Sequence, residues 1–294
     1  MFPTSTDKPH SWASKSMSQF TTQDVSVVVC TKNSVSGIQA CLKSIREANV
    51  GQLIVVDAHS TDGTMEFNGE LADVVLTDPG SGLGNARNVG IKETTRSLIL
   101  NMGSDNVLPA GELEKMIKYL QTGNLHGVAA QTQIVGDDFC SRGLNAWRAG
   151  RFTEGERTVI GTPTLFLGDI LRENPYDSSR KFSDDSELCE RWAKEFGARF
   201  AISNAYVLEV GKTSWQEVRI RAKMYGISDH EIFIENSNRW TLLRKAKSLS
   251  HPITSDFVTP VRHLPLSQAA SAIPFLGAFT ALRYAGWITS SLAK

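Results

Sequence analysis

The sequence lacks an excess of charge of either sign, because 31 lysines and arginines balance 31 aspartates and glutamates. No overall field therefore attracts nucleic acid, and no nucleic-acid partner is expected. Cysteine is scarce, and the four cysteines form no C-x-x-C pair, so neither a disulfide framework nor a zinc site is expected. The polar N-terminus has no apolar segment typical of a signal peptide. These features indicate a cytoplasmic protein with reduced thiols.

Long hydrophobic runs are also missing. A membrane-spanning helix needs about 20 predominantly apolar residues, whereas the most apolar segment, 264–292, is interrupted by Gln268, Pro274 and Arg283. This segment leaves two readings open: an element lying in a membrane interface, anchored by Trp287 and Arg283, or a helical lid. The first reading would make the protein peripheral on the cytoplasmic face of a membrane.

The chain does contain short apolar runs that alternate with amphipathic stretches. The predicted strands are 25–30, 53–56, 72–76, 97–100, 127–135 and 201–210. The predicted helices are 38–45, 84–92, 109–120 with Pro109 at its first position, 184–196 and 215–225. Alternating strands and helices predict an α/β fold with a mixed, mostly parallel sheet flanked by helices.

Polar residues follow three of the predicted strands. Thr31 and Asn33 follow the first strand, Asp57 the second, and Ser104 and Asp105 the fourth. Ligands of such sheets bind beyond the carboxyl ends of the strands, so these side chains should converge on one crevice. Asp57 could accept a hydrogen bond from the ring N–H of uracil or guanine, or it could cap the helix that follows.

The chain resembles the family-2 inverting glycosyltransferases of the GT-A fold in a series of segments that occur in the same order: VSVVVCTKN, CLKSI, LIVVDAHSTDGT, GLGNARNVGI, LILNMGSDNVLP, FSDDSELCERW and VRIRAKMYG. The resemblance extends to about residue 226 and implies a GT-A catalytic domain over 24–228. The polar residues 1–23 are typical of a disordered leader. Residues 229–294 are predicted to form a helical C-terminal extension.

The resemblance implies transfer of a sugar from a nucleoside diphosphate sugar to a hydroxyl of a polysaccharide, glycolipid or lipid-linked acceptor. In the family, Thr31 and Asn33 would line the nucleoside pocket. The segment Gly103-Ser104-Asp105 stands where the family has its D-x-D motif, whose last aspartate binds the metal. Asp105 would therefore bind Mg²⁺ or Mn²⁺, which suit oxygen ligands and bridge a diphosphate. Gly103 departs from the pattern, because the family has an acid there.

Two further positions complete the predicted site. Arg87 offers the donor a cation or a stacking face. Asp185 resembles the catalytic base of the family, which deprotonates the acceptor hydroxyl, and the neighbouring Asp184 should raise its pKa. The same two acids would also stabilise the N-terminus of a helix. Arg191 could serve the diphosphate or form an ion pair on the helix surface.

Three alternative functions fit the sequence less well. A dinucleotide-binding dehydrogenase is rejected, because its glycine motif would follow the first strand and the glycines of 80–90 follow the third. A sugar-phosphate nucleotidyltransferase would need a glycine-rich loop ending in basic residues after the first strand, which 31–33 does not provide. A non-catalytic nucleotide- or glycan-binding descendant is made credible by Gly103, whereas Asp105 and Asp185 argue against it.

Overall fold

The computed structural model describes residues 19–292 apart from 79, 81, 181–183 and 212. Of the leader expected over 1–23, residues 1–18 thus lie outside the described residues. Phe20 packs against the core, and Thr22–Asp24 form a short 3-10 helix. The described chain therefore joins the fold a few residues before the expected boundary.

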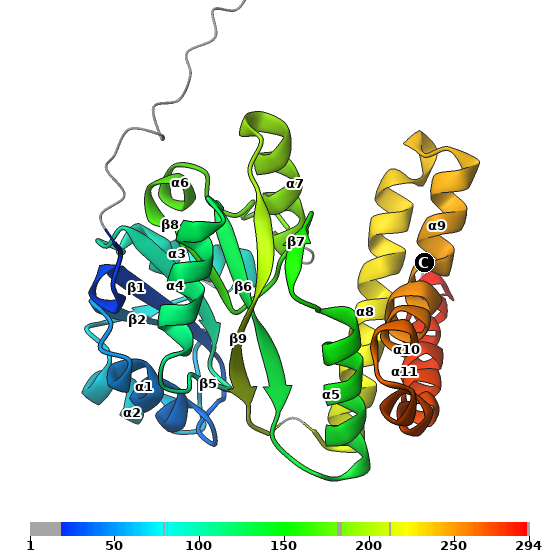
Figure 1. The fold of residues 1–294 in the computed structure, drawn as a ribbon, viewed down its shortest axis with the longest axis horizontal. Coiled ribbons are helices and arrows are strands. Elements are labelled where there is room, and N and C mark those ends of the chain that lie inside the picture. Colours follow the sequence, from blue (N-terminus) through cyan, green and yellow to red (C-terminus); the bar gives the residue numbers. More distant parts are fainter. Residues whose placement is uncertain (1–18, 79, 81, 181–183, 212, 293–294) are drawn as a thin grey trace, which may run out of the picture.

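Nine strands of the described chain form one mixed sheet (Figure 1). In pairing order they are β3 (Val74–Thr77), β2 (Gln52–Asp57), β1 (Val25–Thr31), β4 (Leu98–Gly103), β8 (Thr164–Leu167), β6 (Gly127–Ile134), β9 (Phe200–Glu209) and β5 (Asn106–Val107), with β7 (Gly155–Arg157) paired to β9. The strands β3, β2, β1 and β4 are parallel, and β6 is parallel to β9. Strand β8, which the sequence pattern did not predict, is antiparallel to both of its neighbours. The expected α/β class is confirmed.

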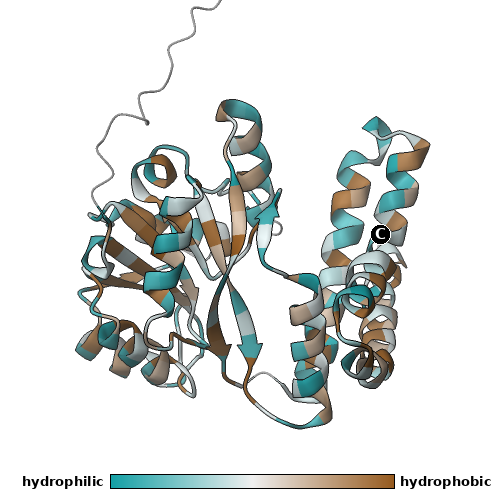
Figure 2. Cartoon of the chain, in the orientation of Figure 1, coloured by the Kyte–Doolittle hydropathy of each residue, from teal (hydrophilic) through white to brown (hydrophobic). Residues whose placement is uncertain are grey.

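Helices cover both faces of the sheet because its strands are apolar on both sides. One face packs against α1 (Ile38–Glu47), α2 (Thr64–Leu71) and α4 (Glu112–Thr122). The other face packs against α3 (Leu83–Lys92), α6 (Gly168–Glu173) and α7 (Asp184–Phe196). Figure 2 shows hydrophobic residues concentrated on the central strands of the sheet.

A third hydrophobic cluster lies outside these two layers. It joins α5 (Phe139–Arg151), α8 (Trp215–Asn236) and α11 (Leu266–Leu292). Between α8 and α11 the chain forms a 3-10 turn (Ser237–Arg239), α9 (Leu242–Ile253), a π-helical segment (Thr254–Val258) and α10 (Thr259–His263). These helices stand beside the sheet, and α5 connects them to it (Figure 1).

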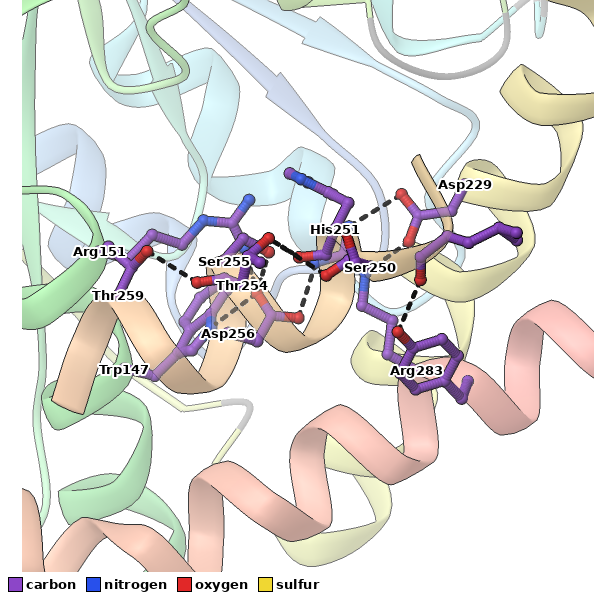
Figure 3. A network of polar contacts seen from close by, with 12 residues as sticks. Trp147, Arg151, Asp229, Ser250, His251, Thr254, Ser255, Asp256, Thr259 and Arg283 are labelled. Carbon is purple, nitrogen blue, oxygen red and sulfur yellow. Dashed lines mark hydrogen bonds and ion pairs between the residues drawn. The ribbon is translucent and has the colours of Figure 1, made fainter. Parts of the chain in front are cut away.

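A buried ionic network fixes this helical group (Figure 3). Asp256, fully buried, accepts hydrogen bonds from Trp147 Nε1 (3.1 Å), Arg283 Nη1 (2.7 Å) and Arg151. The remaining nitrogens of Arg283 bind Asp229 at 2.7 and 2.8 Å. Two carboxylates and two guanidinium groups thereby neutralise one another, which buried charges require. The network ties α5, α8 and the π-helical segment to α11.

Some predicted boundaries differ from the structure. The helix expected to start at Pro109 begins at Glu112, because Gly111 adopts a left-handed conformation (φ 81°) at its N-cap. The helix expected to end at residue 225 continues to Asn236. The proposed domain boundary at residue 228 therefore falls inside α8.

Close contact between α8 and α11 depends on two glycines. A Cβ added to Gly226 would lie 1.8 Å from the Arg283 carbonyl oxygen, and one added to Gly286 would lie 2.2 Å from the Lys223 carbonyl oxygen. Both clashes involve backbone atoms, so the helices themselves would have to move apart.

We expect Gly226→Ala to lower the free energy of unfolding by about 1–3 kcal/mol or more, the usual cost of overpacking. Gly277→Ala is the matched control in α11, because the nearest atom to its added Cβ is 3.9 Å away. The control should leave stability unchanged or raise it by up to about 1 kcal/mol through helix propensity. Denaturant titration of both variants measures the difference, and equal stabilities would contradict the proposed close contact.

Candidate active site

Three neighbouring strands end at one edge of the sheet, and each carries predicted site residues. In the parallel register Thr31 faces Asp57, and Cys30 faces Gly103. Ser104 and Asp105 follow Gly103 directly. The structure thus brings the predicted residues of β1, β2 and β4 to the same edge, because parallel strands that are adjacent end together.

Asp57 and Asn33 shape the loop after β2. The buried carboxylate of Asp57 accepts hydrogen bonds from the backbone N–H (2.8 Å) and the hydroxyl (2.6 Å) of Ser60. Asn33 Oδ1 accepts a hydrogen bond from the Thr61 N–H at 3.0 Å. Next to them, the Thr31 hydroxyl is buried and has no hydrogen-bond partner among the described residues. A buried polar atom without a partner at a strand end suits a bound nucleoside.

The turn after β4 brings the Asp105 side chain close to Gly103. The Ser104 hydroxyl lies 2.9 Å from that of Ser34, which joins this turn to the loop after β1. A Cβ added to Gly103 would lie 2.8 Å from Asp105 Oδ1 and 3.1 Å from Asn106 Oδ1. The Asp105 carboxylate therefore approaches the space that an acidic side chain at position 103 would need.

A cavity of about 440 Å³ opens beside this turn and is called the donor-side cavity below. Three of the predicted residues line it: Arg87, Ser104 and Asp105. Thr31, Asn33 and Asp57 are not among its lining residues and lie along the neighbouring strand ends. Asp185 does not line the cavity itself but contacts Arg87, which does.

Two arginines that the sequence analysis did not single out also line the donor-side cavity. Arg148 of α5 and Arg221 of α8 bind the buried Glu209 at 2.6 and 2.5 Å. Arg148 Nε and Arg221 Nη1 are buried and have no hydrogen-bond partner in the described part of the chain. Two guanidinium groups against one carboxylate leave unused donors that suit an anionic ligand. Arg221 lies in the VRIRAKMYG segment, a signal that could have drawn attention to it, whereas Arg148 has no such signal.

Arg87 joins α3 to the start of α7. Its buried Nη1 donates hydrogen bonds to Asp184 Oδ2 (2.7 Å) and Asp185 Oδ1 (3.0 Å), and Nη2 donates to Thr162 Oγ1 (2.6 Å). The guanidinium carbon lies 5.1 Å from the centre of the Tyr176 ring, and the Tyr176 hydroxyl is 3.4 Å from Asp185 Oδ1. One side chain therefore positions both acids of the predicted base motif. Thr162 belongs to the segment Gly161-Thr162-Pro163, which resembles the stretch before the base in the family, whereas Tyr176 was not predicted to take part.

The charges around Asp185 act in opposite directions. Burial raises the pKa of Asp185 above its ordinary value, Arg87 lowers it, and Asp184 raises it again. The effect of Asp184 has the direction that the sequence analysis expected. Burial by itself would lower the pKa of Arg87. Several neighbouring groups, Asp185 first among them, raise the pKa of Arg87 above its ordinary value, so the guanidinium stays charged. A carboxylate with a raised pKa beside a fixed cation is suited to accept a proton.

Two other predicted roles concern Arg191 and the metal. Arg191 binds Glu187 Oε1 at 2.7 Å and the Pro175 carbonyl oxygen at 2.6 Å, so it forms the helix-surface pair. Across the described residues, no group of three or more His, Cys, Asp or Glu side chains is placed to hold a metal ion. Asp105 would therefore supply one carboxylate, with substrate phosphates and water completing the shell, which is a common arrangement for Mg²⁺.

Comparison with known proteins relates the chain to a family. The sequence model described as "Glycosyl transferase family 2" matches residues 26–202. A search of curated proteins finds no significant match. The solved structure of the mannosyltransferase PcManGT from Pyrobaculum calidifontis, in complex with GDP-Man and Mn²⁺, is similar with a TM-score of 0.56 and 19% identity, over 96% of this chain and 90% of that one.

TarS 1–349 from S. aureus is similar with a TM-score of 0.50 and 18% identity, over 90% of this chain and 89% of that one. The same fragment in complex with UDP matches with a TM-score of 0.50 and 17% identity, over 90% and 89% of the two chains. These likenesses show the GT-A fold.

Replacing Arg87 tests whether this residue holds the two acids of the site in place. We expect Arg87→Met to lower the free energy of unfolding at pH 7 by about 3–5 kcal/mol, because it leaves two adjacent carboxylates without their buried partner. Arg87 lowers the pKa of Asp185, so without it this pKa would rise further in the folded state. The variant should therefore lose stability as the pH rises through this pKa and regain it as Asp185 is protonated at lower pH.

The matched control is Arg199→Met, which breaks an ion pair with Glu156 whose side chains are 48% and 65% exposed. Exposed pairs contribute about 0–1 kcal/mol, so this variant should remain close to the parent protein. Denaturant titrations at several pH values make the comparison. If Arg87→Met lost little free energy of unfolding, or lost more as the pH fell, Arg87 would not be the residue that holds the two acids.

Proposed function

The chain belongs to glycosyl transferase family 2, and from that membership we propose that it transfers a sugar, with inversion, from a nucleoside diphosphate sugar to a hydroxyl group of a glycan or lipid-linked acceptor. As a member of this family the protein is a glycosyltransferase that uses a nucleotide-sugar donor. The observation that carries the proposal is the position of Arg87, which lines the donor-side cavity and contacts Asp185 at 3.0 Å. Donor and base are thereby neighbours.

The donor would lie along the ends of β1, β2 and β4. Asp57 and the unpartnered Thr31 hydroxyl would contact the base and ribose, and Asn33 would hold the loop around them. The unused N–H groups of Arg148 and Arg221 suit the diphosphate. Donor phosphates beside Asp105 and Ser104 would complete the predicted metal site.

The metal, when bound, would offset the charge that develops on the departing nucleoside diphosphate. Mg²⁺ and Mn²⁺ both fit the oxygen donors of Asp105 and its turn. The solved complex of PcManGT contains Mn²⁺ and GDP-Man. For this chain we propose the same classes of ligand, a divalent cation and a nucleoside diphosphate sugar.

Asp185 would act as the base. It takes the proton of the acceptor hydroxyl as the hydroxyl oxygen forms a bond to the anomeric carbon, and the bond to the diphosphate oxygen breaks with its electron pair. Attack opposite the leaving group inverts the anomeric centre. Because its pKa is raised, Asp185 holds an accepted proton more readily than an ordinary aspartate does.

We expect Asp185→Asn to reduce transfer by about 10²–10⁴-fold, the usual contribution of a general base, while nucleotide binding is kept. The activity of the parent protein should fall on the acid side as Asp185 is protonated, at a pH above the ordinary range of an aspartate. Nucleotide release from a panel of donors with and without Mn²⁺ measures transfer. Thermal shifts with UDP, GDP, TDP and CMP measure binding.

Asp105→Asn is the paired variant for the donor side. It should lose the part of the nucleotide thermal shift that depends on Mn²⁺, whereas Asp185→Asn should retain it. Transfer by Asp185→Asn at the parental rate would refute the assignment of the base. If no donor turned over while UDP or GDP still stabilised the protein, the alternative of a non-catalytic nucleotide- or glycan-binding protein would be favoured.

A second proposal concerns membrane contact through residues 264–292. None of the described helices is both long and apolar enough to cross a bilayer. Over α11, Arg283 is the sole charged residue and it is buried, so the exposed side of this helix carries no charge. Figure 2 shows α11 mainly in white and brown. Its exposed apolar residues are Leu266, Ile273, Ile288 and Leu292.

Helix α9 adds basic residues beside this surface. The Tyr284 hydroxyl of α11 donates to the Leu249 carbonyl oxygen of α9 at 2.7 Å, which joins the two helices. Helix α9 exposes Leu242 and Leu243 and carries Arg244 next to them. Exposed apolar residues flanked by basic ones are typical of helices that lie in the interface of an anionic membrane.

We expect the protein to float with vesicles of phosphatidylcholine and phosphatidylglycerol, and Ile273→Asp to weaken this binding by roughly tenfold or more, because one buried isoleucine is worth about 1.5–3 kcal/mol. Met65→Asp on α2, 42% exposed in the parent protein, is the control and should bind as before. Equal binding by both variants, or no binding by the parent protein, would favour the alternative in which α11 serves as a lid.

A further inference from the structure

A second cavity, of about 970 Å³, lies between α7 and the helices α8 and α9, and is called the α7–α9 cavity below. In Figure 1 α8 and α9 stand apart from α7, to its right. Residues of α7 line one wall, and residues of α8 and α9 line the other. None of the residues proposed for donor binding lines this cavity.

The α7–α9 cavity adjoins the proposed reacting centre. Tyr225 lines both this cavity and the donor-side cavity. Ser186, which follows Asp185 in α7, lines the α7–α9 cavity, whereas Arg87, which Asp185 contacts, lines the donor-side cavity. Asp185 itself lines neither cavity, but its chain neighbour lines one and its ion-pair partner lines the other. A base that deprotonates an acceptor attacking the donor must lie near both substrates.

Some cations of the α7–α9 cavity are already neutralised. Arg151 and Arg283 belong to the network around Asp256 and Asp229 (Figure 3). Arg191 is likewise paired, with Glu187 at 2.7 Å. These groups hold the walls in place and offer little net charge to a ligand.

Three further cations line the same cavity, and two of them have no ion-pair partner among the described residues. Lys194 of α7 and Arg244 of α9 form no ion pair within the described residues, and Arg244 lies 4.4 Å above the Trp240 ring. Arg180 forms a long ion pair, with its Nε 3.7 Å from Asp177 Oδ2, and this Nε is buried without a hydrogen-bond acceptor in this part of the chain. The α7–α9 cavity therefore presents three cations and aromatic rings. Glu190 is its one lining carboxylate outside the pairs above.

We propose that the α7–α9 cavity is the acceptor site and that the acceptor carries a phosphate group, bound by Arg180, Lys194 and Arg244. The inference rests on the proposed function, since it assigns the second substrate of the same reaction. Phosphate recognition by converging cations uses charge-assisted hydrogen bonds. The aromatic rings of Tyr225 and Trp240 would contact the sugar or hydrocarbon part of the acceptor. The phosphate could belong to a soluble glycan or to a lipid headgroup.

The test titrates phenyl phosphate into the full-length protein saturated with Mn²⁺ and the nucleotide that stabilises it most, so that the donor-side cavity is filled. Calorimetry should show binding of phenyl phosphate and none of benzyl alcohol. The double variant Lys194→Gln/Arg244→Gln should weaken the binding of phenyl phosphate by roughly tenfold or more, because two charge-assisted contacts are lost. Glu190→Gln should strengthen it, since a competing carboxylate is removed.

The control is Lys43→Gln/Lys92→Gln, which makes the same change of charge at exposed positions on α1 and α3. It should bind phenyl phosphate as the parent protein does. The inference is overturned if phenyl phosphate does not bind, if the two double variants weaken binding equally, or if Glu190→Gln has no effect. Nucleotide binding in the same sample separates the two proposals, because its loss would contradict the proposed function instead.

Vesicles distinguish the two sources of phosphate. Phosphatidylcholine vesicles with and without phosphatidic acid are compared by flotation. Retention that requires phosphatidic acid, is displaced by phenyl phosphate and is lost in Lys194→Gln/Arg244→Gln supports a lipid-linked acceptor. Binding of phenyl phosphate without any effect of phosphatidic acid supports a soluble phosphorylated acceptor.

Discussion

The buried guanidinium of Arg87 is the interaction on which the proposed site depends. A charge removed from water needs partners, and Arg87 finds them in Asp184, Asp185 and Thr162. These partners belong to α7 and to the loop before β8, so one side chain fixes the start of α7 against α3. Burial and the neighbouring Asp184 leave the pKa of Asp185 raised, although Arg87 lowers it. The proton affinity proposed for the base thus follows from how α3 and α7 are joined.

The other half of the molecule depends on a different ionic group. Asp256 and Arg283 tie α11 to α5 and α8, and Gly226 lets α8 and α11 approach closely. Because α5 and α8 also carry Arg148 and Arg221, the position of the helical group decides where these cations meet the donor-side cavity. The C-terminal helices therefore contribute to both proposed substrate sites and do not form an independent appendage.

Other residues of the donor-side cavity can compensate for the acid that the family has at position 103 and that Gly103 replaces here. An acid at this position would meet the Asp105 carboxylate, so the segment Gly103-Ser104-Asp105 contributes one acid, Asp105, to the cavity. Arg148 and Arg221 place buried, unused donors on the same cavity. We infer that charge on a departing diphosphate would be met by these arginines as well as by a metal, so that less depends on a complete acidic pair.

The sequence by itself determined the apolar strands β1, β2 and β4, the extent of α7 from Asp184 to Phe196, and the edge of the sheet at which Thr31, Asp57 and Asp105 lie. Local periodicity encodes these features, and adjacent parallel strands must end together. Only the tertiary structure decided the antiparallel insertion of β8, the partners of Arg87, and the meeting of Arg148 with Arg221, which are 73 positions apart in the chain. Such contacts depend on the order of strands and on the direction of side chains in packed helices, which no local pattern of residues specifies.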